Sequence, residues 1–114
     1  MNDGSILGDV RVACGLDSAD SSFDDELILH TNSFLFRAAQ FGVGKKGFFV
    51  ATDAEKWNQF VEDGFQNFEA LKTYVGLSVR LLFDPPESSA TQAAMKETIK
   101  EMEWCLYIEK DIAE

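Results

Sequence analysis

LKTYVGLSVRLLFDPP, residues 71–86, carries too many apolar side chains for a surface helix. At about 100° per residue, these side chains and Phe68 spread over more than half of a helix circumference. A helix that is apolar on most sides needs neighbours on most sides. Asp84-Pro85-Pro86 ends it, because proline has no N–H and disfavours the helical conformation of the residue before it. The stretch therefore predicts a central buried helix at about residues 67–83.

Capping residues and glycine stops predict further helices around this one. Ser5 or Asp3 stands where an N-cap is expected, and Ser22 begins a sequence that resembles a capping box. Thr52 begins another such box, and Gly42 suits the left-handed residue that ends a helix. The expected helices span about residues 5–15, 23–41, 53–61 and 88–110. We therefore expect an all-α bundle of about four to five helices.

A chain of 114 residues without an internal break in composition is long enough for one core and too short for a second. The sequence thus predicts a single domain over residues 1–114. The apolar positions that recur at helical spacing give the expected core. They include Phe34, Leu71, Val75, Leu82, Met95, Ile99 and Met102.

Two large apolar residues of the second expected helix lie away from its core face. Leu29 and Phe36 are seven residues apart and fall among polar side chains on the opposite side. Either they pack under the first or last helix, or they form a contact between subunits.

The segment at about residues 42–51 combines three glycines with two lysines and predicts an exposed loop followed by a short extended run. It lacks the GxxxxGK[ST] pattern of a phosphate-binding loop. Lys45 and Lys46 mark its tip, and Phe48 and Phe49 either fold back onto the helices or face a partner.

The last turns of the chain are apolar on every side, which is unusual for a terminus. Either this tip folds over the top of the bundle or a partner covers it. Its apolar residues are Trp104, Cys105, Leu106, Tyr107, Ile108 and Ile112.

Charge and composition argue against several classes of function. A net charge of −10 argues against gripping a nucleic-acid backbone, which requires clustered Lys and Arg. No apolar run reaches the roughly 18 residues of a membrane span, and no signal peptide is visible, so we expect a soluble protein made in the cytosol. Cys14, Cys105 and His30 stand alone, without ligand spacing or a nucleophile motif. We expect no metal, no cofactor and no catalysis.

The ordered motifs resemble the small head-tail connector, or adaptor, proteins of tailed bacteriophages and prophages. The likeness extends over most of the chain, and its most specific part is KTYVGLSVRLLFDPP followed by a helix that contains EMEW, residues 101–104. Supporting motifs are ILxxV at 6–10, FDDELILHTNS at 23–33, QFGVG at 40–44 and GFFV at 47–50.

This resemblance implies a non-enzymatic virion component at the head-tail interface, made in the bacterial cytoplasm. Family members assemble as a ring of about a dozen copies under the portal protein, extend the DNA channel and carry the stopper or tail-completion protein. It implies that the tip from Trp104 to Ile112 lies towards the portal and that the loop 45–50 contacts the channel or a neighbouring subunit. DNA would pass through without specific binding, along an acidic wall.

A ring needs two different patches that meet between neighbouring subunits. Leu29 and Phe36 are one expected half, and Trp104 and Ile108 are the other. Two rival functions stay open: an acidic mimic of DNA that binds a host DNA-binding protein, and a small enzyme with perturbed titratable groups in a pocket.

Overall fold

The computed structural model describes residues 4–113, with side chains described to residue 107. Within these residues the chain forms five helices and no strand, which confirms the predicted all-α fold. The helices are α1 (Ile6–Ala13), α2 (Asp24–Gln40), α3 (Trp57–Phe60), α4 (Phe68–Phe83) and α5 (Ser89–Ala113).

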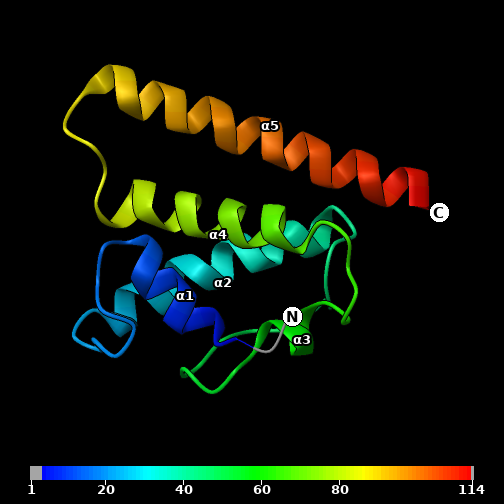
Figure 1. Cartoon of the computed structure of the whole chain (residues 1–114), viewed down its shortest axis with the longest axis horizontal. Helices are drawn as coiled ribbons and strands as arrows, with labels where there is room; N and C mark the ends of the chain where they lie inside the picture. The colour runs from blue at the N-terminus through cyan, green and yellow to red at the C-terminus, as the bar shows by residue number, and fades with distance from the viewer. Residues whose placement is uncertain (1–3, 114) are drawn as a thin grey trace.

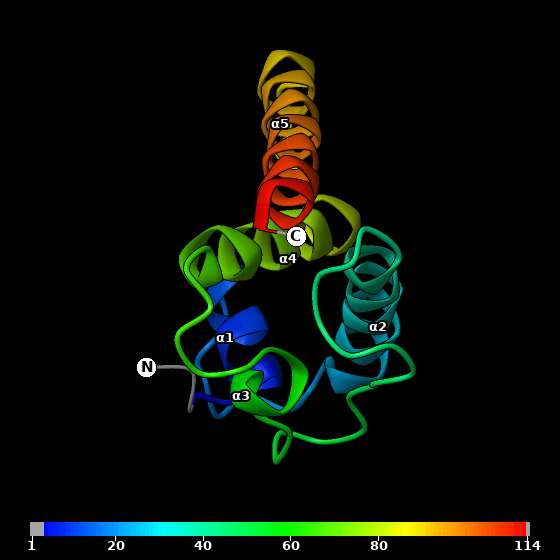
Figure 2. The same ribbon diagram turned by 90° about the vertical axis from the view of Figure 1, so that its right-hand side faces the viewer.

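The other long helices pack around α4, as expected for a helix with so many apolar side chains. It contacts α1, α2 and α5. Figure 1 shows α5 antiparallel to α4 on its outer side, and Figure 2 shows α1 and α2 on the other side of α4. Leu71, Val75 and Val79 of α4 are completely buried. The predicted central helix at about 67–83 is confirmed.

Local signals position several helix ends. The Ser5 hydroxyl accepts a 3.0 Å hydrogen bond from the Gly8 N–H and caps α1. Gly15 and Gly42 follow α1 and α2 with φ of +82° and +92°, a conformation that glycine adopts without steric cost. Ser88 Oγ accepts from the Thr91 N–H at 3.3 Å at the start of α5.

Two predicted caps are wrong. The N-cap of α2 is Phe23, with no side-chain hydrogen bond, where Ser22 was expected. Thr52 and Glu55 do bond to each other, with the Thr52 N–H 2.9 Å from Glu55 Oε1, but they close a turn. The short helix α3 begins only at Trp57.

Arg11 of α1 is buried, at 3% exposed, and its side chain bonds to the segments that follow this helix. Its guanidinium donates to both carboxylate oxygens of Asp24, with Nε 3.0 Å from Oδ1, and to the Ser18 carbonyl at 2.7 Å. Buried charge of this kind requires such pairing. The hydrogen bond to Asp24 raises the pKa of Arg11.

The expected core is correct at its centre and differs at its edges. Ile99 and Met102 of α5 are half-buried against the core, and Met95 and Phe34 are also half-buried. Leu82 is 52% exposed and is not a core residue. It shares the direction of Leu71 and Val75 but lies in the last turn of α4, past the last completely buried position.

Candidate interaction surfaces

The C-terminal half of α5, whose last turns run past the start of α4 (Figure 1), carries an exposed aromatic pair. Trp104 and Tyr107 are 63% and 47% exposed, and their rings stack with centroids 6.2 Å apart. Leu106 differs from the prediction, because it is 1% exposed and belongs to the core cluster. The side chains of Ile108 and Ile112 lie outside the described residues.

A polar contact fixes α5 to the body one residue before Trp104. Glu103 accepts a 2.8 Å hydrogen bond from the Tyr74 hydroxyl and bonds from Arg37 to both of its oxygens. Tyr74 is buried, and burial together with Glu103 raises the pKa of its hydroxyl. The orientation of the Trp104–Tyr107 pair therefore depends on a defined contact.

Leu29 and Phe36 form an exposed ridge on α2, and each is 65% exposed. The opposite side of α2 is buried, with Leu27 and Leu35 in the core. The alternative in which the first or last helix covers Leu29 and Phe36 is therefore wrong. They remain a candidate subunit contact, which we call the α2 ridge.

The loop at 42–51 is partly anchored. The side chain of Asn32 makes two hydrogen bonds to the backbone of Val50. Its Oδ1 accepts from the Val50 N–H at 2.7 Å, and its Nδ2 donates to the Val50 carbonyl at 2.9 Å. Phe48 folds back against Phe60, with ring centroids 5.4 Å apart. Phe49 is 65% exposed, and Lys45 and Lys46 are also exposed.

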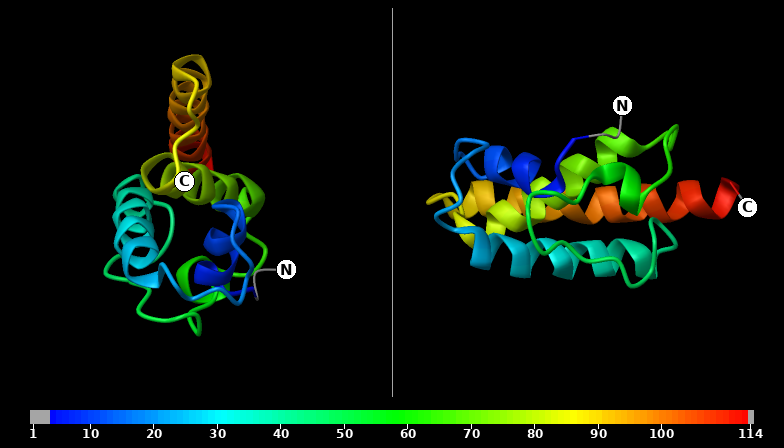
Figure 3. Two further views of the ribbon diagram at one scale, coloured as in Figure 1. Left: turned by 90° about the vertical axis from the view of Figure 1, so that its left-hand side faces the viewer. Right: turned by 90° about the horizontal axis from the view of Figure 1, so that it is seen from below.

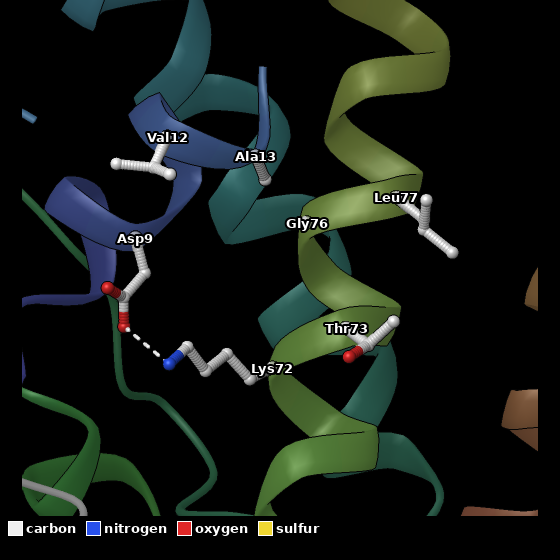
Figure 4. A pocket seen from close by; sticks show the side chains of 7 residues that line it. All are labelled: Asp9, Val12, Ala13, Lys72, Thr73, Gly76 and Leu77. Carbon is white, nitrogen blue, oxygen red and sulfur yellow. Dashed lines mark ion pairs between the residues drawn. The ribbon is translucent and has the colours of Figure 1, made fainter. Parts of the chain in front are cut away.

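A groove between α1 and α4 was not predicted from the sequence. It has a volume of about 360 Å³, and Figure 4 shows its lining residues: Asp9, Val12, Ala13, Lys72, Thr73, Gly76 and Leu77. At its floor Gly76 lies so close to α1 that an added Cβ would be 2.9 Å from that of Ala13. Lys72 Nζ is 3.6 Å from Asp9 Oδ2 across one end. Gly76 within an apolar helix was the one sequence signal of this close approach.

Comparison with known families decides what kind of protein carries these surfaces. A family model described as phage connector protein matches residues 6–113. The chain belongs to the phage connector protein family. This membership confirms the resemblance to head-tail connectors and assigns the chain a connector role in a phage virion. No curated protein and no solved structure matches the chain.

The cysteines and the histidine of the connector lie apart from one another. Burial raises the pKa of the Cys14 thiol to about 11, whereas Cys105 is exposed. His30 is 3.4 Å from Glu26 on the same helix. Among the side chains that the structure describes, no three from His, Cys, Asp or Glu gather as metal ligands. None of the helices described is long and apolar enough to span a bilayer.

Proposed function

We propose that this connector is an adaptor that forms a ring under the portal, extends the DNA channel and joins the capsid to the stopper or tail-completion protein. The observation that carries the proposal is the family match over residues 6–113. Connector families are structural, and the proposed role requires no catalysis, cofactor or membrane. The protein would be made in the bacterial cytoplasm as a single domain and function in the virion.

The proposed portal contact is the far end of α5. Trp104 and Tyr107 support it, because aromatic side chains that are rigid and half exposed are frequent anchors of protein interfaces. Ile108 and Ile112 follow them in the sequence and belong to the same proposed contact. The buried Leu106 instead holds α5 against the body.

The remaining surfaces fit a ring around DNA. A net charge of −10 gives a wall that does not retain passing DNA. The exposed tip with Lys45, Lys46 and Phe49 is the proposed loop contact to the channel or to a neighbour. Phe48 supports the loop from beneath, because its ring packs on Phe60.

Co-sedimentation with capsids tests this function. Purified protein is mixed with capsids that contain a portal but lack a tail, and portal-less shells are the control. We expect binding only where the portal is present, and a clear loss on replacing Trp104 and Tyr107 together with serine. The control variant Leu82→Ser changes a large apolar residue that is 52% exposed and lies outside the proposed contacts, and it should retain portal binding. Equal binding to both kinds of shell would refute the adaptor role.

A further inference from the structure

We propose that the groove between α1 and α4 receives the α2 ridge of a second copy of this chain, in a head-to-tail contact. The inference rests on the proposed ring and assigns its subunit interface. It replaces the expected half at Trp104 and Ile108 with the groove, because these two residues are assigned to the proposed portal contact.

One of the two surfaces is a ridge and the other is a groove. The α2 ridge presents Leu29 and Phe36 two helical turns apart on one line. The groove is lined on either side by Val12, 58% exposed, and Leu77, with the close approach of Ala13 and Gly76 as its floor. A ridge of large side chains packs well where a glycine lets the floor recede.

The two surfaces also lie on opposite sides of the subunit. In Figure 4, which looks into the groove, α2 passes behind α1 and α4. Figures 2 and 3 show α1 and α2 flanking the core on opposite sides. The ridge itself faces away from the buried side of α2. Two different patches on opposite sides generate a head-to-tail contact, which closes into a ring when the rotation between subunits permits.

Charge complementarity favours a second copy as the occupant. Asp25 is exposed one turn before Leu29 on the ridge face, and Arg80 is exposed one turn after Gly76 on the groove face. Neither forms an ion pair with another residue of the described chain. If α2 of one copy lies antiparallel to α4 of the next, Asp25 meets Arg80 and Phe36 lies towards the Lys72 end. In a chain of net charge −10, such a contact also selects the orientation.

Cross-linking in solution tests the contact without a portal. The variant Phe36→Cys/Thr73→Cys, with its second thiol at the Lys72 end of the groove, is made with Cys105→Ser, so that the buried Cys14 is the only other thiol. It is treated at high concentration with a short bis-maleimide. We expect a ladder of covalent dimers, trimers and longer species, because each copy can react at both surfaces. The matched control Phe36→Cys/Ala94→Cys places the second thiol on an exposed position of α5 and should give no ladder.

Two results would overturn the inference. One is a ladder no stronger than that of the α5 control, with both variants folded by circular dichroism. The other is efficient dimer formation by Phe36→Cys alone, which would mean that two ridges meet each other. Binding of the wild-type chain to the portal vertex is measured in a separate experiment, so that failure of this interface and failure of the adaptor role can be distinguished. A failed ladder with intact vertex binding rejects only this interface, whereas a ladder without vertex binding rejects the adaptor role.

Charge reversal gives a second test on the same cross-linking background. Asp25→Arg or Arg80→Asp alone should reduce the ladder by about tenfold, because like charges would then face each other. The two reversals together should restore it. A double reversal as weak as either single one would contradict the pairing.

Discussion

The Tyr74 hydroxyl of α4 donates a 2.8 Å hydrogen bond to Glu103 of α5. The same carboxylate accepts from Arg37 of α2, so that one side chain joins three helices. Glu103 precedes Trp104 directly, which places this contact at the base of the proposed portal-binding end. Apart from it, α5 is held by the buried Leu106 and by its half-buried stripe against the core.

Replacing Tyr74 with phenylalanine should lower the free energy of unfolding by about 2 kcal/mol, because a hydrogen bond to a charged, mostly buried group is lost. Urea denaturation measures the change, and hydrogen exchange should quicken in α5. Tyr107→Phe is the matched control, since Tyr107 is half exposed on the same helix. Equal effects of the two substitutions would show that the bond to Glu103 contributes nothing.

Gly76→Ala should destabilise the protein by about 1–2 kcal/mol, although alanine favours helix formation. The new Cβ would be 2.9 Å from the Cβ of Ala13, too close without a shift of α1. Adding Ala13→Gly should recover most of the loss by removing the opposing methyl group. A stabilisation by Gly76→Ala alone, as at an open helix position, would contradict the close packing.

Thr31→Val should stabilise the fold by about 1 kcal/mol. Thr31 is completely buried, and its hydroxyl has no hydrogen-bond partner in the described part of the structure. Valine has nearly the same shape without the cost of burying that hydroxyl. Thermal and urea unfolding should both show the gain. Thr98→Val, at an exposed position of α5, is the control and should leave stability nearly unchanged.

Stability should fall between about pH 9 and pH 11 because of Cys14. Burial raises the pKa of its thiol from 9.0 to about 11, so in this range the unfolded chain loses a proton that the folded chain keeps. The contribution is fully present below pH 9 and amounts to about 3 kcal/mol. Cys14→Ala should flatten the pH dependence of the free energy of unfolding over this range. Tyr74 is present in both proteins, so its raised pKa cancels in the comparison.

Much of the fold was predictable because its signals are local. Ser5, Gly15 and Gly42 act through neighbouring backbone groups, and the apolar content of α4 is visible without any partner. The prediction that a helix starts at Thr52 was wrong because the bonds between Thr52 and Glu55 are the same in a turn and at the start of a helix. Only the later position of Trp57 in the structure distinguishes them.

The candidate surfaces were less predictable because exposure depends on how the helices pack. Periodicity puts Leu82 on the buried face of α4, but the structure leaves it 52% exposed in the last turn of that helix. Leu106 and Trp104 are only two residues apart in an all-apolar segment, and only the packing of α5 against the core decides that one is buried and the other exposed. The groove forms only where α1 and α4 pack together, so the sequence of either helix by itself does not predict it.

Images of the portal vertex test the central claim most directly. Tailless capsids that contain the portal are incubated with the wild-type protein, and their vertices are averaged by electron microscopy. The adaptor role predicts a ring of new density coaxial with the portal, with a central channel, that is absent from portal-less shells. Portal vertices that remain unchanged when folded protein is present in excess would contradict it.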